Sequence, residues 1–196
     1  MPPSPDHRHR LPLAVRRSTL LRTGLLAGAL CYGAADLVPA FGAVPLELRL
    51  DFHTELMRMN GITVQGAMAL SAVGSFVLTL PAFGPDRLRE RMLAGTAGLL
   101  TVATFLITRF GNVPINARIK EWAATVPPDG HAEVLRRWEL FNLGRAGTAV
   151  AALAVLICAL TPSRRSSSEG VPTRATQSSA TVPAVAGPDR AARTPD

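Results

Sequence analysis

The sequence predicts an all-α fold, a four-helix transmembrane bundle with both termini on the cytoplasmic side and disordered tails. Three observations support this fold class: four long apolar runs, a charged fraction of 18%, and a positive mean hydropathy of +0.21. A helix of about 20 apolar residues crosses roughly 30 Å of hydrocarbon. The runs have too little alternation for barrel strands, and helices are the other structure that satisfies the backbone in lipid. We therefore expect a multi-pass protein of the cell membrane.

The membrane domain is expected over residues 19–161, between a basic tail, 1–18, and a tail rich in Ser, Thr, Pro and Ala, 162–196. The composition of both tails predicts disorder. Arg16 and Arg17, just before the first apolar run, also resemble a twin-arginine export signal, so removal of the first helix remains an alternative. The four helices are expected at about 20–41, 61–83, 92–113 and 138–161.

The first helix has an apolar run that only Asp36 interrupts. Every fourth residue along it forms one stripe, which we expect to face the bundle. The second helix carries Gln65 and several small residues but no charge, which is typical of a scaffold helix. The members of the stripe on the first helix are Gly24, Gly28, Tyr32 and Asp36.

Polar residues form a stripe on each of the last two helices, and both stripes end at the same membrane face. Pro114 removes one backbone hydrogen bond and bends or ends the third helix. In the fourth helix, Trp138, Asn142 and Arg145 project in nearly the same direction. The stripe on the third helix, with spacings of three or four residues, consists of Thr101, Thr104, Thr108, Asn112 and Asn116.

The net charge of +7 would suggest nucleic acid binding in a soluble protein, but here the arginines flank the apolar runs. Because cytoplasmic loops of membrane proteins are enriched in Lys and Arg, these clusters mark the cytoplasmic side. We expect membrane lipids as partners and no nucleic acid. The clusters comprise Arg8, Arg10, Arg16, Arg17, Arg22, Arg87, Arg89, Arg91, Arg164 and Arg165.

The cysteines and histidines show no metal or cofactor signature. Cys31 and Cys158 lie in apolar runs, which is consistent with small buried hydrophobic side chains rather than a disulfide or ligand pair. No histidine lies in the apolar runs, which argues against a membrane haem protein. No glycine loop precedes a helix in the way that nucleotide phosphates require. We expect neither a metal nor a cofactor.

Two charges are expected in the outer part of the bilayer. Asp36 lies about 20 Å along the first helix, and Arg145 lies at a similar depth on the fourth. Because an unpaired charge there is costly, we expect the two to approach each other or share a polar site; the alternative is that Arg145 extends to the headgroups. His53 lies just outside the first helix, where its ordinary pKa suits a general base, although a solvated loop histidine is the plainer interpretation. Trp122 and Trp138 also fit aromatic-belt anchors.

Two motifs stand out in the last third of the membrane domain. One is Thr104-(x)3-Thr108-(x)3-Asn112-Val113-Pro114-Ile115-Asn116-(x)5-Trp122, and the other is Arg137-Trp138-(x)3-Asn142-(x)2-Arg145. Together they resemble the anthrone oxygenase-like family of integral membrane proteins, many of whose members have only a domain-of-unknown-function label. The resemblance covers about residues 25–160.

This resemblance implies a four-helix membrane protein. In some members it implies cofactor-independent oxidation of an anthrone or polycyclic phenol to a quinone by molecular oxygen. As catalytic residues, His53 would be the base and Arg145 would stabilise the anion. The expected substrate-binding residues are Asp36, Thr108, Asn112, Asn116, Trp122, Trp138 and Asn142.

The residues leave three interpretations open. The first is an enzyme with a small-molecule site at the outer ends of helices one, three and four. The second is a membrane binding or transport-associated protein, and the third is a structural helical bundle. An apolar cavity under Asn112 and Arg145 would favour the first two, and a filled core would favour the third. The sequence specifies neither the natural substrate nor the oligomeric state.

Overall fold

The computed structural model describes residues 5–83, 85 and 87–161, and this part of the chain contains helices and no strand. The predicted all-α class is confirmed. The predicted C-terminal tail, 162–196, lies outside the described residues. The elements, with η marking π-helical segments, are α1 (Pro5–Tyr32), η1 (Gly33–Leu37), α2 (Val38–Gly42), α3 (Leu46–Val77), α4 (Leu88–Leu106), η2 (Ile107–Asn112), α5 (Val113–Ala124) and α6 (His131–Leu160).

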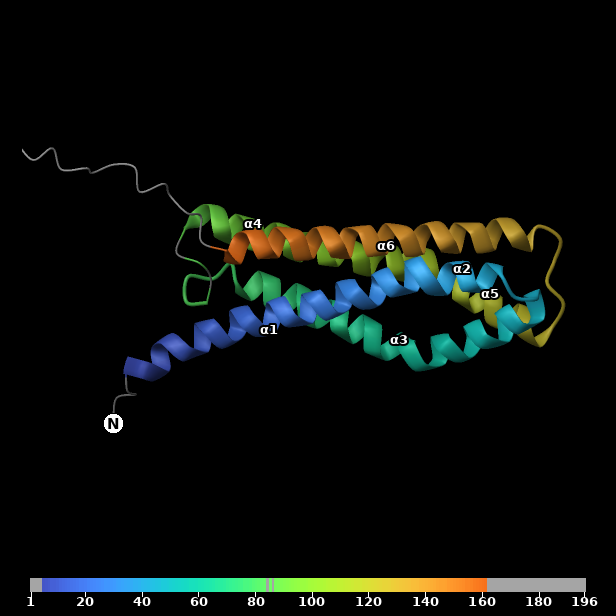
Figure 1. The fold of residues 1–196 in the computed structure, drawn as a ribbon, viewed down its shortest axis with the longest axis horizontal. Coiled ribbons are helices and arrows are strands. Elements are labelled where there is room, and N and C mark those ends of the chain that lie inside the picture. Colours follow the sequence, from blue (N-terminus) through green and yellow to red (C-terminus); the bar gives the residue numbers. More distant parts are fainter. Residues whose placement is uncertain (1–4, 84, 86, 162–196) are drawn as a thin grey trace, which may run out of the picture. The chain divides into compact units, whose positions relative to one another are not determined.

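These elements form a bundle of four long helical segments (Figure 1). The first segment joins α1, η1 and α2, and the third joins α4, η2 and α5. The helices α3 and α6 are the other two segments. Both α1 and α4 contact both α3 and α6, so the four helices surround a common core, and α5 packs against α3.

All four helical segments extend further into polar sequence than predicted. Residues 47–59, expected as a connection between helices, belong to α3, which begins at Leu46. The third helical segment continues beyond Pro114 to Ala124, and α6 begins at His131 after Gly130, whose φ of 86° suits glycine. The apolar runs mark only the membrane part of each helix, whereas tertiary packing stabilises the polar continuations. Likewise, α1 begins at Pro5, well before residue 20.

Three helices are long and apolar enough to cross a membrane: Pro12–Gly42, Leu88–Ala124 and His131–Leu160. The expected fourth spanning helix, α3, does not meet the same criteria among the described residues. Its apolar part contains Asn60 and Gln65 together with several glycines and serines, which lower its mean hydropathy. The chain is therefore a helical membrane protein in which three of the four described helical segments have the length and hydropathy to span the bilayer.

A proline follows each of the two π-helical segments. The N–H of Val38 bonds to the carbonyl of Gly33, and the N–H of Val113 bonds to that of Thr108, both five residues back. The next residue is Pro39 in one case and Pro114 in the other. Because proline has no N–H and its ring clashes with the carbonyl four residues back, the wider turn relieves the crowding and lets the helix continue. Such π-turns occur frequently at functional sites.

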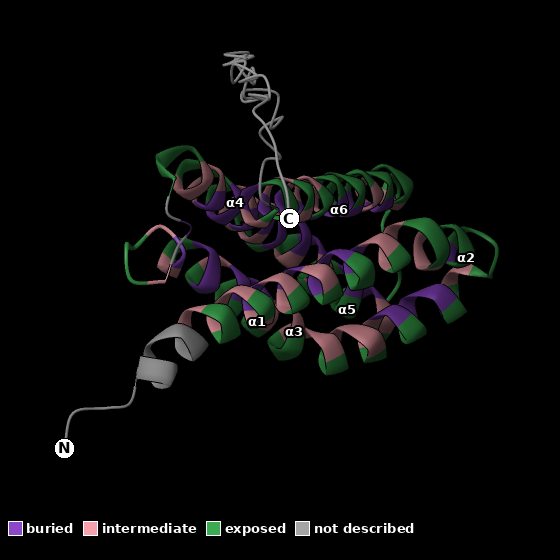
Figure 2. Ribbon diagram, turned by 60° about the vertical axis from the view of Figure 1, so that its left-hand side comes forward, coloured by how far each residue is buried: buried purple, intermediate pink, exposed green. Residues whose placement is uncertain are grey.

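The buried residues lie on the inward faces of the helices (Figure 2). They form three apolar clusters along the bundle. One, at the end where α2 and α5 lie, includes Phe41, Ile119 and Trp138. The next includes Leu30 and Ala146. Along α6, Asn142 and Arg145 lie between Trp138 of the first cluster and Ala146 of the second.

Candidate functional site

A cavity of about 350 Å³ lies between the helices at the level of both π-helical segments. Residues of α1, η1, α2, α3, η2, α5 and α6 line it, so all four helical segments contribute. Most of its wall is apolar, from Leu30 and Phe41 on one side to Leu56 and Val113 on the other. Its polar lining residues are Tyr32, Asn60, Gln65, Thr108, Asn116, Trp138, Asn142 and Arg145.

Arg145 is the charged residue in this lining. Its Nη2 donates to Oδ1 of Asn142, 2.5 Å away, and Nδ2 of Asn142 donates to the carbonyl oxygen of Trp138, 2.7 Å away. The buried Nε of Arg145 has no hydrogen-bond partner, and Arg145 forms no ion pair with any described carboxylate. A partly buried guanidinium without a counterion favours an anionic group in the adjacent space.

The expected pairing of Asp36 with Arg145 is wrong. Asp36 is exposed, does not line the cavity and forms no ion pair among the described residues. The stripe on α1 that was expected to face the bundle is exposed at Gly28 and Asp36, whereas Tyr32 is exposed and also lines the cavity. The buried face of α1 consists instead of larger apolar side chains and two threonines, which pack better in the core: Thr19, Thr23, Leu26, Ala27 and Leu30.

Asn116 connects three of the helical segments through its amide group. Its Oδ1 accepts a hydrogen bond from Nε1 of Trp138 at 2.8 Å and lies 3.2 Å from Nε2 of His53. Its Nδ2 lies 3.1 Å from Sδ of Met57. Since an amide oxygen only accepts, Nε2 of His53 carries the proton in this arrangement. Asn116 and Trp138 line the cavity. The contacts of Asn116 with His53 and Met57 therefore tie this part of the lining to α3.

His53 is fully buried and does not line the cavity. Its ring stacks on Phe41 with centroids 5.4 Å apart and lies 4.5 Å from the ring of Trp138. His53 precedes the apolar part of α3. Burial lowers its pKa from 6.5 to about 4, although the hydrogen bond with Asn116 acts in the opposite direction and raises the pKa. The imidazole is therefore neutral at physiological pH. Its Nδ1 is buried without a partner.

Asn112 lies one turn from Thr108 and one turn from Asn116 on the same helical segment. Its side chain is almost fully buried, and neither amide atom has a hydrogen-bond partner. Burying an unpaired amide costs several kcal/mol. Thr108, which lines the cavity, uses its hydroxyl to donate to the carbonyl of Thr104. The buried amide of Asn112 is therefore unsatisfied, on a helical segment whose neighbouring turns carry the cavity-lining residues Thr108 and Asn116.

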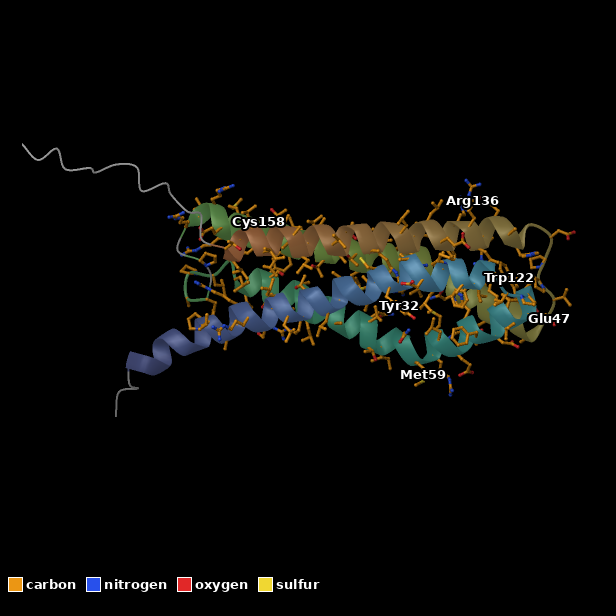
Figure 3. All side chains as sticks on the ribbon, viewed as in Figure 1. Tyr32, Glu47, Met59, Trp122, Arg136 and Cys158 are labelled. Atoms are coloured by element: carbon orange, nitrogen blue, oxygen red, sulfur yellow. The ribbon has the colours of Figure 1, made fainter. Side chains whose placement is uncertain are left out.

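Trp122 does not belong to this cavity. It lines a wider cleft of about 740 Å³ at the end of the bundle, together with Glu47 and Asp51 of α3 (Figure 3). The structure therefore brings Thr108, Asn116, Trp138, Asn142 and Arg145 together in the cavity lining. His53 and Asn112 are buried outside this lining, and Asp36 and Trp122 lie elsewhere.

Residues of α1 and α3 were missed as cavity lining. Tyr32 is exposed on α1, and Met57, Asn60 and Gln65 approach from α3. The signal for α3 was the pair of polar residues Asn60 and Gln65 at the start of an apolar run, which a scaffold helix does not need. Among the described residues, no group of three or more His, Cys, Asp or Glu side chains could hold a metal ion.

The chain matches the family described as anthrone oxygenase over residues 55–155. This range contains Asn112, Asn116, Trp138 and Arg145, and it begins two residues after His53. No curated protein and no solved structure matches the chain.

Proposed function

Because the chain belongs to the anthrone oxygenase family, we propose that it oxidises an anthrone, or a similar polycyclic phenol, to the corresponding quinone with molecular oxygen. The reaction would take place in the cavity of about 350 Å³, whose volume suits a ring system of this size. The apolar wall would bind the rings, and Trp138 would pack against them.

The observation that supports this function best is the state of Arg145. Its guanidinium lines an apolar cavity, holds one hydrogen bond to Asn142 and has no carboxylate partner. An anthrone that loses a ring CH₂ proton becomes an anion whose charge rests on the carbonyl oxygen. A fixed cation beside that oxygen, in a site with little water, stabilises the anion much more than the neutral ketone.

The reaction balances without a cofactor. The CH₂ proton is released to water, and the anion transfers one electron to O₂. The radical and superoxide combine at the same carbon to form a hydroperoxide after protonation. Loss of the remaining C–H proton and cleavage of the O–O bond form the quinone carbonyl, and the second oxygen atom leaves as water. Arg145 is needed in the first step, where charge develops on the oxygen.

We assign His53 a positioning role, which differs from the base expected from the resemblance. Its protonated Nε2 faces Asn116 Oδ1, and the ring lies outside the cavity lining. Through this contact, His53 would hold the Asn116 amide toward the substrate. Asn142 would likewise hold Arg145. Neither residue needs to transfer a proton in this scheme.

The experiment is to incubate the purified full chain in detergent with anthrone under ¹⁸O₂ and to follow quinone formation by absorbance and mass spectrometry. The proposal predicts turnover above the uncatalysed background, with one ¹⁸O atom in each quinone. Binding of anthrone without turnover would instead indicate the binding or transport-associated interpretation. If quinone forms only at the uncatalysed rate and anthrone does not bind to the chain, the assignment of the cavity as the substrate site is wrong as well.

A further inference from the structure

A second groove, of about 310 Å³, lies on the outside of the bundle between α5 and α6, apart from the cavity described above. Residues of η2 and α5 form one wall, and residues of α6 form the other. It shares no lining residue with the cavity. Its lining consists of Phe110, Gly111, Pro114, Ile115, Arg118, Val134, Arg137 and Phe141.

The groove has two arginines and no acidic residue in its lining. Arg118 comes from α5 and Arg137 from α6, and both are exposed. Neither forms an ion pair or a side-chain hydrogen bond with a described residue. Two guanidinium groups that converge on one groove from different helices, with no carboxylate between them, are complementary to an oxyanion such as phosphate.

The other end of the groove is aromatic. Phe110 is 74% exposed, and Phe141 is 38% exposed. The ring of Phe141 lies on the backbone of η2 so closely that a Cβ on Gly111 would come within 2.7 Å of it. Only glycine allows this approach, so residue 111 and Phe141 together form the floor of the groove. An exposed aromatic surface of this kind is suited to contact with lipid chains.

Along the helix axis, the aromatic and basic residues of the groove follow one another as the hydrocarbon and headgroup layers of a membrane do. Phe110 follows the apolar run of α4, and Arg118 lies eight residues later, about 12 Å further along the helix axis. The arginines therefore lie at the level of the headgroups when the phenylalanines lie at the edge of the hydrocarbon. We propose that this groove binds an anionic phospholipid, with the phosphate on Arg118 and Arg137 and the acyl chains on Phe110 and Phe141.

Native mass spectrometry of the full chain in detergent tests the proposal, with phosphatidylglycerol and phosphatidylcholine of equal chain length as the two probes. The wild-type chain should bind phosphatidylglycerol at least about tenfold more tightly. Arg118→Gln and Arg137→Gln should each weaken this binding about tenfold, since each removes a charge-assisted hydrogen bond. Arg136→Gln is the matched control, because the Arg136 side chain points away from the bundle (Figure 3).

Equal binding of the two lipids by the wild-type chain would overturn the proposal. So would an Arg136→Gln effect as large as that of Arg137→Gln, since the attraction would then reflect total charge alone. The preference of the wild-type chain is measured without any substitution, so a variant that fails to fold leaves the test intact. Anthrone turnover has no part in this readout.

Discussion

The indole nitrogen of Trp138 donates a hydrogen bond to the side-chain oxygen of Asn116 across 2.8 Å. This bond joins α6 to α5, and both residues line the cavity. One turn further along α6, Asn142 is bonded to the Trp138 carbonyl and to Arg145. Asn116, Trp138, Asn142 and Arg145 therefore form one connected polar network in the cavity wall, and a change at one of them should be felt at the others.

The pair of substitutions His53→Gln and His53→Ala separates a positioning residue from a base. A glutamine amide can still donate to Oδ1 of Asn116, as Nε2 of His53 does over 3.2 Å, but it cannot take up a proton at neutral pH. We expect His53→Gln to retain kcat for anthrone within about threefold and His53→Ala to lower it about tenfold. Equal, large losses in both variants would mean that the imidazole is the base.

The pH dependence of stability should also report on His53. Its pKa is lowered to about 4 in the folded chain, below the 6.5 of the unfolded chain, so the unfolded state binds more protons between these values. The part of the unfolding free energy that depends on the neutral state of His53 is fully present above pH 6.5. It is lost as the pH drops toward 4, by up to about 3 kcal/mol. Thermal unfolding in detergent should show a steeper loss from pH 7 to 5 for the wild type than for His53→Gln. Parallel curves would contradict a buried neutral histidine.

Asn112→Leu tests whether the unpaired amide has a function. Leucine has a similar volume and needs no hydrogen bond, so it should raise stability by about 1–3 kcal/mol if it packs in the same space. If the amide serves the oxidation, turnover should nevertheless fall, about tenfold in kcat/KM. Melting temperature and turnover are measured on the same preparation. A stabilised variant with unchanged turnover would show that Asn112 has no part in the reaction.

A bulky residue at Gly61 should close part of the cavity. Gly61 lines it, and a Cβ added there meets nothing within 4 Å, so a larger side chain has room to enter. We expect Gly61→Phe to raise the KM for anthrone at least about fivefold and to leave folding intact. Gly66→Phe is the control, since Gly66 has equally open surroundings but does not line the cavity. Equal effects of the two substitutions would place the substrate elsewhere.

Much of the fold and part of the site follow from the sequence. Helical spacing placed Trp138, Asn142 and Arg145 on one face of α6, and the structure has all three in the cavity wall. Spacing alone could not orient α1, because its small residues suit a close helix contact as well as an outward face. For that reason the prediction that Asp36 faces the bundle is wrong.

The contribution of α3 was harder to predict. The polar sequence before residue 60 gives no membrane signal, so His53 and Met57 were expected in a connection rather than on a helix. Their contacts with Asn116 span more than fifty residues of chain and depend on how α3 packs against α5. Such long-range pairing is a property of the tertiary structure that helical periodicity does not contain.

The most direct test of the central claim is the rate of ¹⁸O-labelled quinone formation by Arg145→Gln compared with the wild type and with Arg136→Gln. If the Arg145 guanidinium stabilises the anthrone anion, its loss should lower kcat/KM about 100-fold, or roughly 3 kcal/mol of transition-state stabilisation, whereas Arg136→Gln should match the wild type. A wild-type rate in Arg145→Gln would contradict the account.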